Sequence, residues 1–155
     1  MSEQLLEARE ELKRLEHIIY VSLKYTRTVD VLINALKRLE NVYDRIIEAL
    51  LEQAQEEKRI SALPKSPALR GKMLGELYKE DATFQKYLTF YLFLRTLLNS
   101  PYKKRQEYRR YVTFIVDLDQ LTAEIDCDNL INCERFVQGF LQYAWEKISG
   151  KAIEE

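Results

Sequence analysis

Apolar residues recur along most of the chain at spacings of three and four, the period of an amphipathic helix. Within the first sixty residues they trace two seams, over 5–19 and over 32–50. The two seams do not share one register, and the hydroxyl-rich, β-branched stretch 25–28 lies between them. We therefore predict one helix over 3–24 and a second over about 28–58. A single kinked helix fits the same residues.

The segment 82–98 differs because it is apolar on nearly every side. Only three of the twelve residues from 87 to 98 are not large and apolar. A helix of this kind is normally buried on several faces. It is too short for a bilayer, which takes roughly 20 apolar residues. We predict that 82–98 is the central helix of a bundle, and we expect no membrane association.

Further helical periods follow on both sides of this segment. They predict helices over 68–79, 101–125 and 130–149, and the proline-containing stretch 59–67 as the main interhelical loop. The apolar run 112–116 also suits a strand, but its flanks keep a helical period, so we assign it to 101–125. The predicted fold class is all-α: a helical bundle of about five main helices around the central apolar helix. We expect one domain over 1–155.

Composition fits a globular protein without a global charge field. The chain of 155 residues is 46% hydrophobic and 32% charged, with a net charge of -1. It therefore has no overall attraction to nucleic acid or to an anionic membrane. Two cysteines and a charged start unlike a secretory leader predict a cytoplasmic protein with reduced thiols. The density of Glu, Lys and Arg also suits a thermophile.

Residues for familiar catalytic or metal sites are missing from the sequence. A di-metal carboxylate bundle needs Glu-x-x-His on two helices, but His17 is the only histidine and Arg14 stands three positions before it. Cys127 and Cys133 have no histidine near them to complete a zinc site. No phosphate-binding loop or nucleophile elbow is present. We predict no catalytic residue, no metal and no cofactor, and we favour a non-enzymatic role.

Cations and tyrosines alternate at the start of the helix predicted over 101–125. Cations neutralise phosphates and exposed tyrosines stack on unpaired bases, so this face predicts RNA or DNA binding. The alternative is a solvated basic face whose Tyr108 and Tyr111 belong to the core. The candidate nucleic-acid or anion contacts are Lys103, Lys104, Arg105, Tyr108, Arg109 and Arg110.

A second candidate polar site lies at the break between the first two helices. It consists of Tyr25, Arg27 and Asp30, with hydroxyls at Thr26 and Thr28 between them. A helix break with Thr28 as the N-cap of the next helix explains the same residues without a ligand.

Self-association is the first functional hypothesis. The helices predicted over 3–24 and 28–58 carry many charges beside narrow seams, as dimerising helices do. The second, at roughly 30 residues and about 45 Å, exceeds the other helices, so part of its seam is available to a second subunit. We predict a helical interaction module that forms a homodimer, and as the alternative a helical module that binds RNA or DNA through the basic face.

In helix number and charge distribution the chain resembles small all-helical archaeal proteins, including bundles of the HEPN type. This resemblance implies a helical bundle and, because several such proteins act on RNA, an RNA-directed role. The nuclease members carry an arginine followed, after four to six residues, by a histidine. Here His17 follows Arg9 and Arg14 at other distances, so the resemblance implies no catalytic residue.

Overall fold

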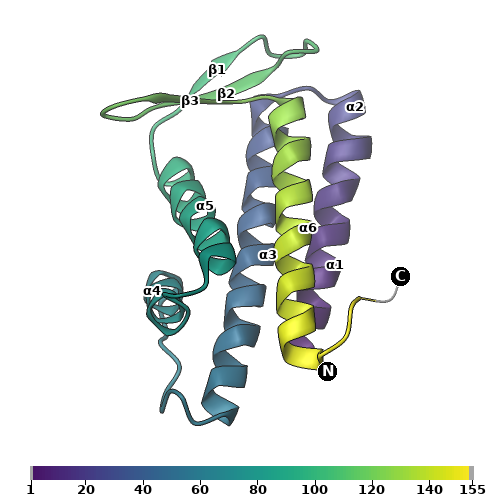
Figure 1. Cartoon of the computed structure of the whole chain (residues 1–155). Helices are drawn as coiled ribbons and strands as arrows, with labels where there is room; N and C mark the ends of the chain where they lie inside the picture. The colour runs from purple at the N-terminus through teal and green to yellow at the C-terminus, as the bar shows by residue number, and fades with distance from the viewer. Residues whose placement is uncertain (1, 154–155) are drawn as a thin grey trace.

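The computed structural model describes residues 2–153 and is predominantly helical, with one small sheet (Figure 1). Three long helices run side by side, two shorter helices flank them, and the sheet lies across one end. The elements in chain order are α1 (Glu3–His17), the π-helix η1 (Ile18–Ser22), α2 (Leu23–Tyr25), α3 (Val29–Glu56), α4 (Pro67–Leu77), α5 (Ala82–Leu98), β1 (Lys103–Arg105), β2 (Thr113–Asp117), β3 (Thr122–Ile125) and α6 (Cys127–Ser149).

The predicted break between the first two helices is confirmed. Residues 3–25 form one continuous helical segment through α1, η1 and α2. Thr28 then adopts an extended backbone, and its side-chain oxygen accepts a hydrogen bond from the Val31 N–H at 3.3 Å. This N-cap satisfies one of the free N–H groups at the start of α3. The kinked single helix is therefore excluded.

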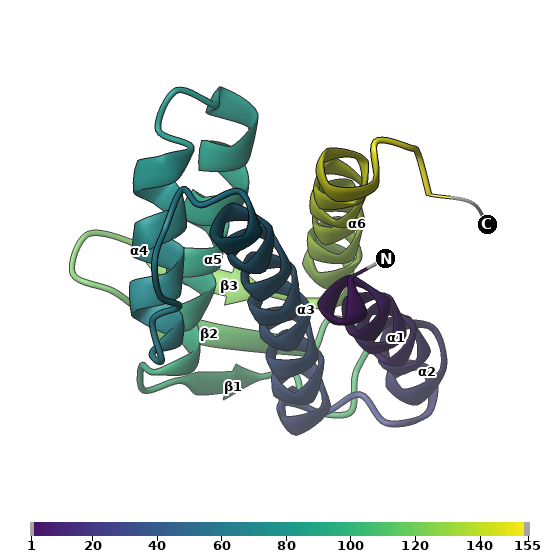
Figure 2. The same ribbon diagram turned by 90° about the horizontal axis from the view of Figure 1, so that it is seen from below.

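The central helix of the fold is α3, not the segment 82–98. Helix α3 packs against α1, α4, α5, α6 and β2, and its buried residues extend from Val29 to Ala54. Helix α5 has the predicted bounds, with Asp81 as its N-cap, but it lies to one side of the three long helices (Figure 2). Its fully buried residues lie along one face. Thr89 and Leu92 on its other face are exposed. The prediction of a central 82–98 helix was wrong because apolar residues all around a helix do not require burial all around it.

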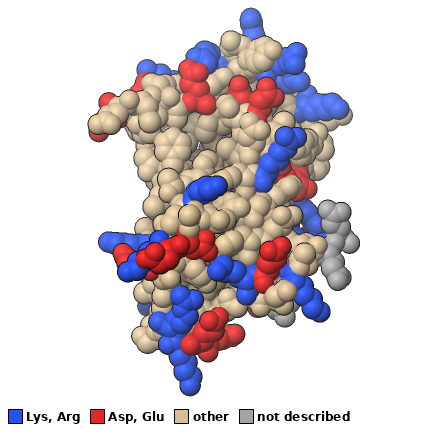
Figure 3. Space-filling view, viewed as in Figure 1, with Lys and Arg blue, Asp and Glu red and all other residues tan. Residues whose placement is uncertain are grey.

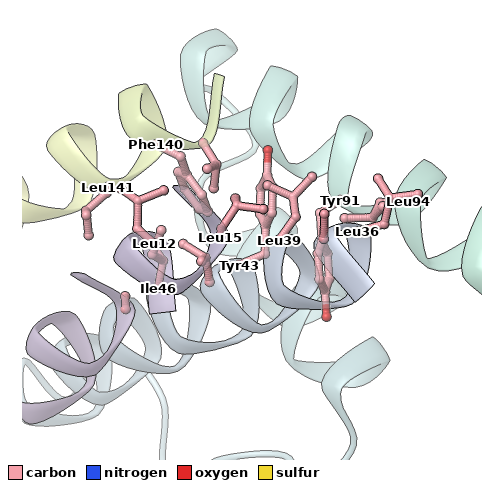
Figure 4. Packing of buried hydrophobic residues seen from close by; sticks show 14 of the residues in the cluster. Leu12, Leu15, Leu36, Leu39, Tyr43, Ile46, Tyr91, Leu94, Phe140 and Leu141 are labelled. Carbon is pink, nitrogen blue, oxygen red and sulfur yellow. The ribbon is translucent and has the colours of Figure 1, made fainter. Parts of the chain in front are cut away.

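Side chains from the long helices and from α5 meet in one continuous hydrophobic cluster (Figure 4). Leu12 and Leu15 project from α1 toward Leu39 of α3, while Phe140 approaches from α6. Tyr43 of α3 lies at the centre, with its ring 5.4 Å from that of Tyr91. The core therefore holds the helices in fixed positions below the sheet.

Three strands lie within residues 103–125, so the helix predicted over 101–125 was wrong. The predicted all-α fold class is confirmed only in part, because the protein is predominantly helical but not purely α. The three strands are antiparallel in the order β1-β2-β3, with Lys104 opposite Phe114 and Ile115 opposite Glu124. Val112, Phe114 and Val116 are buried and follow the two-residue period of a strand. The predicted helical face fails because Tyr108 and Tyr111 are exposed.

The remaining boundaries agree closely with the predictions. The main loop spans 57–66, and Pro67 occupies the start of α4, where its missing N–H costs no hydrogen bond. The side chain of Asp126 accepts a hydrogen bond from the Asn129 N–H at 2.9 Å at the start of α6. Gly150 ends α6 with φ of 73°, a conformation that favours glycine. Both ends of α6 are therefore fixed, and its first turn lies beside the sheet.

Candidate functional site

The two polar sites predicted from the sequence lie against each other at the end of the bundle that carries the sheet. The loop between β1 and β2 packs on the turn between α2 and α3. The Tyr108 N–H donates a hydrogen bond to the Arg27 carbonyl at 2.7 Å, and the Val29 N–H donates one to Glu107 Oε2 at 3.1 Å. Residues almost eighty positions apart in the sequence thus form one surface.

Two cations of the predicted basic cluster are neutralised within the sheet. Lys103 Nζ lies 2.9 Å from Asp117 Oδ2, and this hydrogen bond raises the pKa of Lys103. The Arg105 guanidinium donates two hydrogen bonds to the Glu124 carboxylate, at 2.8 and 3.1 Å. Such bidentate pairs fix both partners in one geometry. These two side chains hold the strands together rather than face a ligand.

In the rest of the cluster, Lys104 forms ion pairs with Asp30 and Glu107, whereas two arginines have no ion-pair partner among the described residues. Lys104 Nζ lies 3.4 Å from Asp30 Oδ1, which links the two predicted sites directly. Within residues 2–153, Arg109 and Arg110 form no ion pair. The Arg110 guanidinium lies 5.4 Å from the ring centre of Tyr111, within cation–π range. The positive charges of Arg109 and Arg110 are therefore available to a ligand.

A pocket of about 350 Å³ opens beside these arginines. Its apolar part includes the buried Ile19 and Leu23, and its cations are Lys24, Arg27 and Arg110. None of these three cations makes an ion pair with another residue in the described range 2–153. The lining residues are Ile19, Tyr20, Leu23, Lys24, Arg27, Arg110, Tyr111, Asp126, Cys127 and Asp128.

Exposed tyrosines are concentrated at the same end of the molecule. Tyr25 and Tyr108 are 82% and 78% exposed, far more than is usual for a large aromatic side chain. Tyr20 and Tyr111 are about half exposed and line the pocket. Figure 3 shows several Lys and Arg side chains along the edge that carries the sheet and α2, with Asp and Glu side chains among them. Aromatic surface and positive charge therefore occur together here.

Two of the three described non-glycine residues with positive φ lie in a loop of this surface, and the third, Lys58, follows α3. Tyr20 lies in the π-helix η1, and single turns of π-helix occur frequently at functional sites. Gln106 and Tyr108, in the loop between β1 and β2, have φ of 55° and 64°. A bulky residue in this left-handed region is strained. The surface therefore combines exposed rings with a backbone that folding alone does not favour.

The first turn of α6 contributes groups of the opposite charge. Asp126 uses its carboxylate to cap the helix, and the side chain of Asp128 forms no hydrogen bond or ion pair with another described residue. Burial raises the pKa of the Cys127 thiol, although the nearby Arg27 opposes this. The protonated thiol form of Cys127 is therefore favoured at neutral pH.

The other candidates from the sequence do not assemble into a site. His17 is exposed on α1, and Cys133 is a half-buried free thiol. Within the described residues, no three His, Cys, Asp or Glu side chains are placed to hold a metal ion. No helix in residues 2–153 has the length and apolarity needed to cross a membrane.

Sequence reasoning did not bring together all the residues of the pocket. Tyr20 was not selected, because it lies in an ordinary helical pattern. Tyr111 was assigned to the apolar side of a helix that does not form. The signal available in the sequence was the clustering of Tyr20, Lys24 and Arg27 within eight positions, next to a predicted helix break.

Comparisons of the chain with protein-family models, with curated proteins and with solved structures found no match. The resemblance to HEPN-type bundles therefore stays a prediction.

Proposed function

We propose that the protein binds single-stranded nucleic acid. The binding surface, here named the Tyr/Arg end, consists of Tyr20, Lys24, Tyr25, Arg27, Tyr108, Arg109, Arg110 and Tyr111. The observation that carries the proposal is the mixture of cations without an ion-pair partner in the described chain and exposed tyrosine rings on this one surface.

The chemistry of this surface favours single strands over duplexes. Lys and Arg neutralise phosphates of any nucleic acid. Exposed aromatic rings add affinity only where bases are unpaired and can stack on them. Tyr25 and Tyr108, the two most exposed tyrosines, are placed for such stacking because most of each ring faces solvent. In a duplex the base faces are stacked on one another and unavailable, so only the charge contacts remain.

The number of available cations sets the expected salt dependence. The Tyr/Arg end contributes four, namely Lys24, Arg27, Arg109 and Arg110. With a slope of about -0.7 per neutralised phosphate for single strands, log K against log salt has a slope of about -2.8. The affinity then falls roughly 50-fold between 50 mM and 200 mM salt. Binding of this kind is moderate in strength, in keeping with the net charge of -1.

Fluorescence anisotropy with labelled 12-nucleotide RNA and DNA strands, titrated at several salt concentrations, tests the proposal. A variant with Arg109→Ala and Arg110→Ala removes two of the four cations. It should weaken binding and reduce the magnitude of the salt slope by about 1.4. A duplex of the same sequence should bind more weakly than either strand.

The matched control is the double variant Lys103→Ala and Lys104→Ala, which removes the same charge from the same segment. Both lysines are in ion pairs with Asp117 and Asp30, so their loss should leave the slope nearly unchanged. Equal losses in the two double variants would show a response to net charge alone. That result, or an affinity that does not change with salt concentration, overturns the proposal.

Tyr108→Gly tests the stacking contribution separately. Glycine accepts the positive φ at this position, so the change removes the ring without adding strain. Loss of one stacked base costs about 1–3 kcal/mol, or about 5- to 150-fold in affinity. The salt slope should stay constant, because the variant keeps every cation. An unchanged affinity would remove Tyr108 from the interface.

The predicted homodimer is a second candidate, supported by a different surface from the one expected. Helix α3 leaves no free seam, because it is buried from Val29 to Ala54 within one chain. An open groove instead follows α5 and contains Phe90 and Phe93, and the middle of this face is largely uncharged (Figure 3). Its rim carries Lys79, Glu80 and Lys86. A second copy related by a two-fold axis can pair these opposite charges.

Light scattering across a dilution series tests the homodimer. The expected mass is twice 18.5 kDa at high concentration, and it should fall to 18.5 kDa in the variant Leu92→Glu. Leu92 is 44% exposed on the same face of α5, so the substitution leaves the core intact. A mass of 18.5 kDa for the unchanged protein at every concentration rules out the dimer.

A further inference from the structure

The pocket at the Tyr/Arg end has the dimensions and the lining of a site for a small ligand. Its volume of about 350 Å³ lies at the lower end of the range for small-molecule pockets. Buried Ile19 and Leu23 form an apolar part, and the half-exposed rings of Tyr20 and Tyr111 stand at its edge. Such a lining offers an aromatic base both apolar contact and stacking.

Charge in the pocket is arranged for one phosphate group. Lys24, Arg27 and Arg110 supply three positive charges, and the carboxylates of Asp126 and Asp128 supply two negative ones. A phosphate monoester carries about -1.5 to -2 at neutral pH, which three cations can match. A triphosphate brings a much larger negative charge against the same two carboxylates. On charge alone, a monophosphate fits this lining better than a triphosphate.

We infer that this pocket binds a nucleoside monophosphate, either free or as the 5′-phosphorylated terminal nucleotide of a strand. The phosphate contacts Arg27 and Arg110, and the base lies against the tyrosine rings. Asp128, which has no partner among the described residues, accepts hydrogen bonds from the sugar or the base. The inference rests on the proposed function for the strand, because it names which nucleotide enters the pocket, but the pocket is also testable without a strand.

Two oligonucleotides that differ only at one end separate the sources of the phosphate. An 8-nucleotide RNA with a 5′-phosphate should bind at least ten-fold more tightly than the same RNA with a 5′-hydroxyl. Calorimetric titration should show that adenosine monophosphate binds, whereas adenosine, adenosine triphosphate and inorganic phosphate bind at least ten-fold more weakly. Inorganic phosphate as effective as the nucleotide overturns the inference, because the pocket is then a simple anion site.

Adjacent arginines provide a matched pair of variants. Arg110 lines the pocket, whereas Arg109 belongs to the same loop and does not. Arg110→Gln should abolish the preference for the 5′-phosphate and the binding of adenosine monophosphate. Arg109→Gln removes the same charge, and it should weaken both RNAs equally while keeping the preference. Equal effects of the two substitutions on the preference overturn the inference.

The proposed function and the pocket inference fail in different ways. Salt-sensitive strand binding with no 5′-phosphate preference and no nucleotide binding overturns the pocket inference and leaves the proposed function intact. Binding of adenosine monophosphate that is lost in Arg110→Gln, without any strand binding, supports the pocket and overturns the proposed function. The same protein samples serve both experiments.

Discussion

A buried pair of carboxyl groups between α1 and α6 should make the stability of the protein depend on pH. Glu134 is only 2% exposed, and its side chain accepts a hydrogen bond from Gln138 Nε2 at 2.5 Å. Burial, followed by the hydrogen bond and charge of Glu16, raises the pKa of Glu134 from 4.5 to about 7. Arg135 and Gln138 act in the opposite direction but do not cancel these effects.

The sign of the effect follows from where the proton is held. Between pH 4.5 and 7 the folded protein keeps a proton on Glu134 that the unfolded chain has lost. The free energy of unfolding therefore falls as pH rises through this range and changes little from this source above it. At about 1.36 kcal/mol per pKa unit, the difference has an upper bound of about 3 kcal/mol. Sharing of the proton with Glu16 reduces it, so we expect about 1–3 kcal/mol.

Glu134→Gln removes the titrating group and keeps the shape of the side chain. The variant should be more stable than the unchanged protein by about 1–3 kcal/mol at pH 8. The two should be nearly equal at pH 4.5, where the glutamate is neutral in the fold. Urea unfolding of both proteins at pH 4.5, 6, 7 and 8 measures the difference directly. Other carboxylates also reduce the stability in acid, but they do so equally in both proteins, so their contribution cancels in the difference.

Glu16→Gln serves as the control on the partner side. It removes the charge that helps to raise the pKa of Glu134, so it should give a smaller stabilisation of the same sign at pH 8. A difference between the unchanged protein and Glu134→Gln that does not vary with pH would refute the reasoning. Destabilisation by Glu134→Gln at pH 8 would refute it as well.

Three further predictions concern tyrosines. Tyr43 Oη is buried without a hydrogen-bond partner among the described residues, so Tyr43→Phe should stabilise the fold by about 1–2 kcal/mol in urea unfolding. Tyr91→Phe deletes the hydroxyl that donates a hydrogen bond to Asp44, 2.5 Å away, and should destabilise the fold by a similar amount. The prediction is contradicted if Tyr43→Phe and Tyr91→Phe change the stability in the same direction. Tyr108→Gly relieves a positive φ and should raise the unfolding free energy by about 0.5–1 kcal/mol, whereas a loss of stability would show that the ring supports the fold.

The helices could be predicted closely because their ends carry strong local chemistry. Thr28, Asp81 and Asp126 are polar N-caps, and Gly150 adopts the left-handed conformation of a helix end. Each of these signals acts within a few residues, so the sequence alone displays it. The position of α5 in the fold depends instead on which helix offers more apolar faces. Helix α3 offers more apolar faces and therefore takes the central position, which residues 82–98 alone do not indicate.

The sheet was missed because two periods fit the same residues. Tyr108, Tyr111, Ile115 and Leu118 follow a helical spacing, whereas Val112, Phe114 and Val116 follow that of a strand. A warning was present, because the helix predicted over 101–125 placed its cations at the N-terminal end and its acids at the C-terminal end. In the sheet, having the cations first and the acids later along the chain is favourable, because the fold places Lys103 beside Asp117 and Arg105 beside Glu124. Conflict with the helix dipole was thus evidence of a wrong element.

The candidate site could be predicted in part, residue by residue, but not as a unit. Arg27 and Arg110 were both selected from the sequence, and only the fold shows that they line one pocket. Lys103 and Arg105 looked equally suitable, yet their partners come from strands that the sequence did not reveal. Availability of a charge depends on its neighbours in space, which is why composition and spacing could not separate the two halves of the cluster.

The fold and the proposed binding role favour different residues at the position of Tyr108. Folding would favour glycine, because the backbone is in the left-handed region and the ring is 78% exposed, so it contributes little apolar burial. A tyrosine that weakens the fold at this position therefore needs a reason outside the fold. The loop that carries it is fixed to the bundle by the hydrogen bond from its N–H to the Arg27 carbonyl, which holds the ring beside the cations of the Tyr/Arg end. Strain at an exposed aromatic residue, next to arginines without ion pairs in the described chain, is in keeping with the proposed nucleic-acid contact.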